Sequence, residues 1–112
     1  MDCIFCKIAN GTIPSARVYE DSDFFAFRDS NPVAPVHILV VPKRHLADAL
    51  EGSTQPGFME GLMRVAAGIA RQEGLEGAGF RLVINTGADG GQSVKHLHLH
   101  ILGGRKMTWP PG

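Results

Sequence analysis

The spacing of hydrophobic positions changes along the chain and predicts where the main helix forms. Apolar residues recur every three or four positions from Phe58 to Ile69, after Pro56 and before Gly74. A proline at the start and a glycine at the end are typical of helix boundaries. This segment is therefore the one long helix, and residues 45–51 favour an additional helical turn.

A shorter helix is expected near the N-terminus. Asp2 can cap its first turn, and Gly11 lies where it should stop. The spacing predicts that its apolar face comprises Ile4, Phe5 and Ile8.

Five other segments have the pattern of strands. Residues 18–20 and 24–28 flank a short polar turn, and residues 37–41 form an unbroken apolar run typical of a strand buried on both faces. Residues 80–85 and 97–102 alternate with a period of two. Strands outnumber helices and the connections are short, so the class is α+β with antiparallel pairing.

Length and charge narrow the classes of function. The 112 residues, 44% of them hydrophobic, suit a single domain over residues 1–112 with a modest core, and a homodimer is expected to add stability. A formal net charge of zero argues against a nucleic-acid partner. No apolar run is long enough for a signal peptide or a membrane span, so a cytoplasmic location is expected.

The most informative segment is a row of three histidines that alternate with aliphatic residues. With a period of two, His96, His98 and His100 share one face of a strand. The opposite face, expected to join the core, comprises Leu97, Leu99 and Ile101. Three of the five histidines of the chain gather here, which disfavours a merely solvated face.

Two chemical interpretations of this row differ in what the imidazoles bind. A single metal ion held by all three is disfavoured, because the outer Cα atoms of such a strand are about 13 Å apart, although neighbouring histidines could still share an ion. A phosphate site is favoured, in which one neutral imidazole attacks phosphorus and its neighbours bind the oxygens. The central His98 is placed to attack.

The two cysteines of the chain, Cys3 and Cys6, have a C-x-x-C spacing that indicates metal or redox chemistry. A thioredoxin-like use needs a strand before the motif, and the few residues before Cys3 cannot form one. A zinc site would need two more ligands.

The segment His96-Leu97-His98-Leu99-His100-Ile101-Leu102 resembles the signature of the histidine-triad (HIT) family. Residues 3–14, 27–43 and 83–104 and the terminal Trp-Pro-Pro-Gly resemble its Hint branch, the purine nucleoside phosphoramidases. The resemblance implies a HIT-like fold, with a sheet of about five antiparallel strands, one long helix, short helices, and a sheet continued across a two-fold dimer. It also implies hydrolysis of the P–N bond of nucleoside phosphoramidates.

The resemblance assigns a role to each catalytic candidate. His98 would take the nucleotidyl group as a covalent intermediate, and His100 would bind phosphate and aid the leaving group. His96 and His37 would support the nucleophile, and the Ser93 hydroxyl would contact the phosphate or the leaving atom.

The same resemblance implies a nucleotide-binding surface. Asp29 would bind the ribose hydroxyls, and Asn85 would lie near the phosphate. Ser30 departs from the larger apolar residue that is common at its position, which affects the choice of base. The apolar slot for a purine would comprise Ile4, Phe5, Ile8 and Phe27, although Ile8 suits ordinary core equally well.

Some bacterial relatives of this kind hold a structural zinc, and the resemblance extends to their ligands. The set would be Cys3, Cys6, His45 and His96. The resemblance also implies that Trp109 and the tail pack on a neighbouring subunit. Three alternatives stay open: a dinucleoside polyphosphate hydrolase, a nucleotide-binding interaction module with vestigial catalysis, and a structural protein that depends on zinc.

Overall fold

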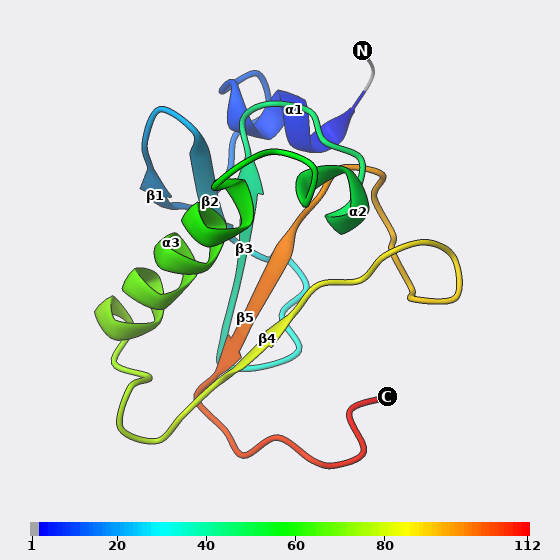
Figure 1. The fold of residues 1–112 in the computed structure, drawn as a ribbon. Helices are drawn as coiled ribbons and strands as arrows, with labels where there is room; N and C mark the ends of the chain where they lie inside the picture. The colour runs from blue at the N-terminus through cyan, green and yellow to red at the C-terminus, as the bar shows by residue number, and fades with distance from the viewer. Residues whose placement is uncertain (1–2) are drawn as a thin grey trace.

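The computed structural model describes residues 3–112, which form one antiparallel sheet with helices on both faces (Figure 1). The helices are α1 (Ile4–Ala9), α2 (Ala49–Gly52) and α3 (Phe58–Gln72). The strands are β1 (Arg17–Glu20), β2 (Phe24–Arg28), β3 (Val36–Pro42), β4 (Arg81–Val83) and β5 (Leu99–Gly103). Their order in the sheet is β1-β2-β3-β5-β4, and every neighbouring pair is antiparallel. The predicted α+β class with a five-stranded antiparallel sheet is confirmed.

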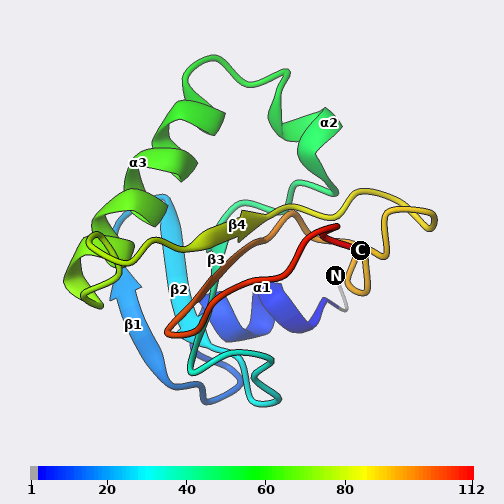
Figure 2. The same cartoon turned by 90° about the horizontal axis from the view of Figure 1, so that it is seen from below.

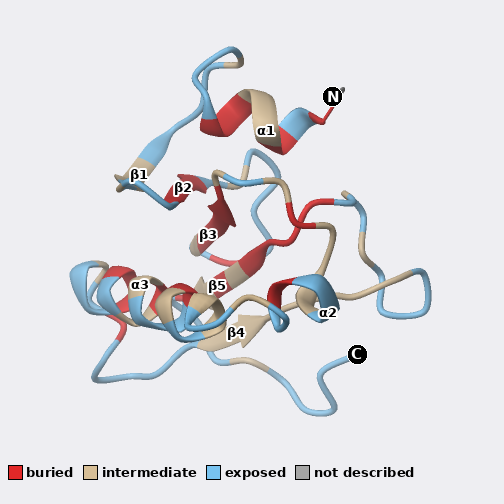
Figure 3. Cartoon of the chain, turned by 45° about the horizontal axis from the view of Figure 1, so that its top comes forward, coloured by how far each residue is buried: buried red, intermediate tan, exposed pale blue. Residues whose placement is uncertain are grey.

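Two apolar clusters lie on opposite faces of the sheet, and β3 contributes residues to both. Ile38 and Val40 lie in the cluster under α3, whereas Leu39 and Val41 lie in the cluster under α1. Figure 2 shows α3 and α1 on opposite sides of the strands, and Figure 3 shows that the central strands are the most buried. The predicted burial of β3 on both faces is confirmed.

The start of α1 differs from the prediction. The predicted cap, Asp2, lies outside the described residues, and the N-cap of α1 is Cys3, whose side chain accepts a hydrogen bond from the backbone N–H of Cys6. The predicted apolar face was wrong at Ile4, which is 51% exposed, because the buried face of the helix comprises Phe5, Ile8 and Ala9.

Strand β5 starts two residues later than predicted, for a reason that lies in its partner. The pairing of Leu99 with Val40 would place Leu97 opposite Pro42. Proline has no N–H to donate, and the Pro42 carbonyl accepts from the side chain of His96. Leu97 donates its N–H to the Leu46 carbonyl instead, at 2.7 Å.

Other element boundaries also differ from the prediction, and β1 and β3 extend slightly beyond the predicted residues 18–20 and 37–41. The edge strand β4 covers Arg81–Val83 rather than residues 80–85, and the helical turn predicted at 45–51 is α2, capped by Asp48. Between residues 3 and 112, the helices are too short or too polar to cross a membrane.

Two glycine substitutions test the assignment of α3. Gly68 lies inside the helix, and a Cβ there would meet no atom within 4 Å, so Gly68→Ala should raise the free energy of unfolding by about 1 kcal/mol. Gly74 ends the helix with a φ of +75°, so Gly74→Ala should lower it by about 1 kcal/mol. Urea unfolding of both variants checks this, and equal signs would contradict the assignment.

Candidate functional site

The histidine row lies between the sheet and α1. Leu97, Leu99 and Ile101 belong to the cluster under α3, so the alternation turns the three imidazoles toward α1. His96 and His98 are buried, and His100 is partly buried. The Phe5 ring of α1 meets the His98 ring edge to face at a centroid distance of 5.0 Å and the His96 ring at 6.0 Å. The short N-terminal helix thus covers the row.

His98 is held with its proton on one particular nitrogen. Its Nδ1 lies 2.8 Å from the backbone carbonyl oxygen of His96, and a carbonyl can only accept, so Nδ1 carries the hydrogen. In the neutral ring the lone pair is therefore on Nε2. No hydrogen bond is made by Nε2 within residues 3–112, and none of their buried side-chain nitrogen or oxygen atoms lacks a partner. Nε2 consequently reaches solvent, where a ligand can meet it.

His100 is held in the complementary way by a relay through His37. The backbone N–H of Val33 donates to His37 Nδ1 at 3.1 Å, so the hydrogen of a neutral His37 is on Nε2. That nitrogen lies 2.9 Å from His100 Nδ1, which must accept. The hydrogen of His100 is then on its own Nε2. The site presents a bare nitrogen on His98 and an N–H donor on His100.

Burial keeps the relay neutral. Desolvation, with further contributions from His98 and His37, lowers the pKa of His100 to about 4. Desolvation also lowers the pKa of His37, although the nearby Asp29 carboxylate opposes the shift. Both rings are therefore uncharged at neutral pH, as the assignment of their protons requires.

Asp29 stands beside the relay. Its Oδ2 lies 3.5 Å from His37 Nε2, and its Oδ1 accepts from the Asn31 N–H at 2.8 Å. Ligand atoms of Asp29, His37 and His100 lie within 4.8 Å of one another, close enough for a metal ion. The Val33 N–H, however, keeps the His37 proton on the nitrogen that would face the ion. The arrangement favours a hydrogen-bond relay over a metal site.

A glycine-rich loop of residues 86–93 follows β4. Asn85 donates from Nδ2 to the Gly90 carbonyl at 2.8 Å, so its side chain supports the loop. Gln92, which the sequence did not single out, accepts from the Gly87 N–H and donates to the Ala47 carbonyl. No hydrogen bond of the described residues joins the Ser93 hydroxyl to a histidine. Gln92 ties the loop to the segment before α2.

The apolar residues expected to hold a base divide into two groups. Phe5 and Phe27 pack together at a centroid distance of 5.7 Å, and both are buried with Ile8 in the cluster under α1. Ile4 is half exposed at the start of α1. Of the buried members, Phe5 contacts the His98 ring directly, whereas Ile4 lies at the surface.

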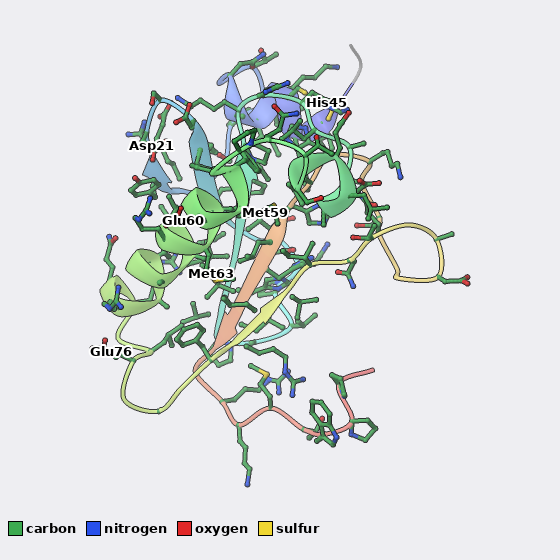
Figure 4. All side chains as sticks on the ribbon, viewed as in Figure 1. Asp21, His45, Met59, Glu60, Met63 and Glu76 are labelled. Carbon is green, nitrogen blue, oxygen red and sulfur yellow. The ribbon has the colours of Figure 1, made fainter. Side chains whose placement is uncertain are left out.

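A second cluster joins one end of the row to both cysteines. His96 Nδ1 lies 3.4 Å from Cys3 Sγ and 3.5 Å from Cys6 Sγ, and its Nε2 donates to the Pro42 carbonyl. His45 Nδ1 lies 3.3 Å from Cys6 Sγ and 3.2 Å from His96 Nδ1. Figure 4 shows His45 beside α1. Four donor atoms thus converge from segments far apart in the sequence.

These distances fit a tetrahedral zinc ion. Bonds of about 2.3 Å to sulfur and about 2.0 Å to nitrogen separate sulfur from nitrogen by about 3.5 Å, and two nitrogens by about 3.3 Å. The four donors, Cys3, Cys6, His45 and His96, all lie within 4.8 Å of one another. The Pro42 carbonyl holds the proton of His96 on Nε2, which leaves Nδ1 free to ligate.

Several groups that shape the site carry no sequence signal. The Val33 N–H, the His96 carbonyl and the Pro42 carbonyl are backbone groups, which every residue type except proline offers in full. Sequence patterns also did not single out Arg105. Its guanidinium donates two hydrogen bonds to the Val33 carbonyl. Only the tertiary structure reveals these partners.

Comparison with known proteins shows the family and the fold of the chain. Residues 10–107 match the sequence model of the HIT domain. An uncharacterised HIT-like protein of Synechococcus elongatus is 53% identical over 99% of this chain and 97% of its own length. A 14 kDa zinc-binding protein of Zea mays is 51% identical over 97% of this chain and 87% of its own. The crystal structure of a HIT family hydrolase from Legionella pneumophila superimposes with a TM-score of 0.95 and 47% identity, covering 99% and 100% of the two chains.

The cluster of two cysteines and two histidines predicts that the protein binds zinc and that this binding requires the cysteines. Purified protein should contain about one zinc per chain, and Cys6→Ser should lose most of it and melt at a lower temperature. His37→Asn, which alters the other cluster, is the matched control and should keep its zinc. Elemental analysis with thermal melting checks this, and equal zinc in Cys6→Ser and the unmodified protein would contradict it.

The buried relay predicts a loss of stability in acid. The pKa of His100 is lowered from 6.5 to about 4, so the folded state binds fewer protons than the unfolded state between these values. The free energy of unfolding should therefore fall as the pH drops below about 6.5 and stop falling from this group near pH 4.

Urea unfolding between pH 7.5 and 4.5 measures this dependence. His100→Gln removes the titrating group, so its stability should fall less steeply with decreasing pH than that of the unmodified protein. Equal slopes for the two proteins would contradict the assignment.

Proposed function

The chain belongs to the HIT domain family, and from this premise we propose that it is a nucleotide hydrolase that cleaves the P–N bond of purine nucleoside phosphoramidates. The observation that carries the proposal is the opposite protonation of two neighbouring imidazoles. His98 offers a lone pair on Nε2, and His100 offers an N–H on Nε2. A nucleophile and a donor side by side suit substitution at phosphorus.

The first step forms a covalent intermediate on His98. The lone pair of its Nε2 attacks the α-phosphorus, the N–P bond forms, and the P–N bond to the leaving amine breaks. The amine departs with the electron pair of that bond and must gain a proton. The His96 carbonyl stabilises the positive charge that develops on the His98 ring, because it accepts from Nδ1–H.

Donors around the phosphate assist this step. The Nε2–H of His100 can bind a non-bridging oxygen as charge develops there. Ser93, in the loop held by Gln92, is proposed to contact the leaving nitrogen and relay a proton to it, its hydroxyl accepting a proton from solvent as it donates its own. His96 is proposed to act through its carbonyl, which orients His98, and His37 through its hydrogen bond to His100.

The second step releases the nucleotide. Water attacks phosphorus, the N–P bond to His98 breaks, and its electron pair returns to Nε2. The proton lost by the water leaves with solvent or the phosphate. The sum is one phosphoramidate and one water converted to a nucleoside monophosphate and an amine.

Nucleotide recognition is proposed to use residues on two sides of His98. Asp29 would accept from the ribose hydroxyls, and Asn85 would position the phosphate loop. The base would lie against an apolar wall. The residues of that wall are Phe5, Phe27, Ile8 and Ile4.

Zinc is proposed as a structural group. Cys3, Cys6, His45 and His96 would hold it, and the name of the Zea mays relative supports the choice of metal. When bound, it would supply a rigid link between α1 and the first histidine of the row.

A two-fold homodimer is proposed to extend the sheet. Strand β4 is an edge strand with an unpaired side, and unpaired edges are suited to strand pairing. Phe80, next to β4, is 40% exposed, and Trp109 is 81% exposed. A neighbouring subunit would cover these apolar side chains and bring its tail close to the leaving group.

Hydrolysis of a fluorogenic adenosine phosphoramidate tests the proposal. His98→Ala should lose more than about a thousandfold in turnover, because it removes the attacking nitrogen, and should bind adenosine monophosphate nearly as well as the unmodified protein. Acid quenching of the unmodified protein should trap an adenylyl group on His98, detectable by peptide mass spectrometry. Absence of turnover in the folded, unmodified protein would instead favour a binding module.

A further inference from the structure

The loop that sets the proton of His37 is itself held from the other end of the chain. Val33 lies in the loop between β2 and β3, and its side chain is 60% exposed. Its backbone makes two hydrogen bonds: the N–H donates to His37 Nδ1, and the carbonyl accepts from Arg105. The position of this one residue therefore depends on Arg105 more than on packing.

Arg105 donates two hydrogen bonds to the Val33 carbonyl. Its terminal nitrogen lies 2.9 Å from the Val33 oxygen and its Nε lies 3.3 Å from it, while the other terminal nitrogen donates to the Lys106 carbonyl at 3.1 Å. The hydrogen bonds are charge-assisted, which makes them stronger than those of a neutral donor. The guanidinium is thus oriented as a clamp on the loop.

The chain before Arg105 is shaped for this approach. Gly104 has a φ of +87°, and a Cβ at its position would lie 2.8 Å from the Cβ of Pro35. Only glycine allows the end of β5 to lie this close to the loop. Two separate features, the glycine contact and the arginine clamp, hold the same few residues of the loop against the same turn.

The direction of the relay depends chiefly on that hold, because the Asp29 carboxylate, which also favours a hydrogen on His37 Nε2, lies 3.5 Å from that nitrogen and is the weaker influence. If the Val33 N–H moves away, a neutral His37 can carry its hydrogen on Nδ1 and accept through Nε2. His100 Nδ1 would then donate to His37, and His100 Nε2 would lose its hydrogen. An imidazole that should donate to phosphate would present a lone pair instead.

We propose that Arg105 is a positioning residue that, through the Val33 peptide groups, selects the tautomers of His37 and His100 and so keeps His100 a hydrogen-bond donor toward phosphate. The catalytic consequence rests on the proposed function, whereas the selection of the tautomers does not. The lowered pKa values of both rings support it, because a choice between tautomers exists only for neutral imidazoles.

The ¹⁵N resonances of the imidazole rings test the structural part directly, because a protonated and a bare ring nitrogen resonate far apart. In the unmodified protein at pH 7.5, Nε2 of His37 and of His100 should be protonated. In Arg105→Gln both residues should show averaged or reversed patterns. Arg64→Gln is the matched control, since Arg64 pairs with Glu60 on the exposed surface of α3 and does not reach the relay.

Kinetics test the catalytic part on the same proteins. Turnover of the fluorogenic adenosine phosphoramidate should fall about tenfold in Arg105→Gln with KM nearly unchanged, because the donor acts as charge develops and not on binding. The turnover of Arg105→Lys, which retains a cationic donor, should lie between those of Arg105→Gln and the unmodified protein, and the turnover of Arg64→Gln should match that of the unmodified protein.

The outcomes separate this inference from the proposed function. Unchanged ring patterns in Arg105→Gln would overturn the inference, whether or not turnover falls. Altered patterns with lower turnover support it in full. If the unmodified protein hydrolyses nothing, altered patterns still support the selection of tautomers, and only the proposed reaction fails.

Discussion

A buried imidazole needs partners for its nitrogens, and the partner decides which nitrogen carries the hydrogen. In this protein three backbone groups take that part: the His96 carbonyl for His98, the Val33 N–H for His37, and the Pro42 carbonyl for His96. Each group can only donate or only accept, so it leaves no choice of tautomer to a neutral ring. The chemistry available to the site follows from these three hydrogen bonds.

The same constraint divides one row of histidines among different tasks. His96 turns its bare nitrogen to the cysteine sulfurs, His98 turns its own to solvent, and His100 accepts from His37. His96, which lies beside both cysteines, also supplies the carbonyl that orients His98. Whatever fixes the side chain of His96 therefore also steadies the backbone that holds His98.

The fold places the site on the inner strands of the sheet and on the helix that covers them. Strands β3 and β5 are neighbours inside the sheet; β3 is covered on both faces, and β5 is covered on the face toward α3. Helix α1 closes the row with the Phe5 ring and supplies both cysteines. The side chains that would move a proton and bind phosphate are thus held by a backbone that is packed in the core.

Much of the fold was determined by the sequence alone, because periodicity is a local property. The alternation of histidine and aliphatic residues predicted which side of the strand joins the core, and the apolar run of β3 predicted burial on both faces. Helix α3 could be placed from its spacing and its terminal glycine. The HIT signature indicates the family from the sequence alone.

What the tertiary structure decided depends on groups that have no sequence signal. The start of β5 depends on Pro42, opposite Leu97, and on its carbonyl. The exposure of Ile4 and the cap at Cys3 depend on which side of α1 meets the sheet. The tautomers depend on backbone groups, and the hold of Arg105 on Val33 spans 72 residues of chain. Sequence patterns report the period of side chains along one element, whereas hydrogen-bond partners are chosen by how the elements pack together.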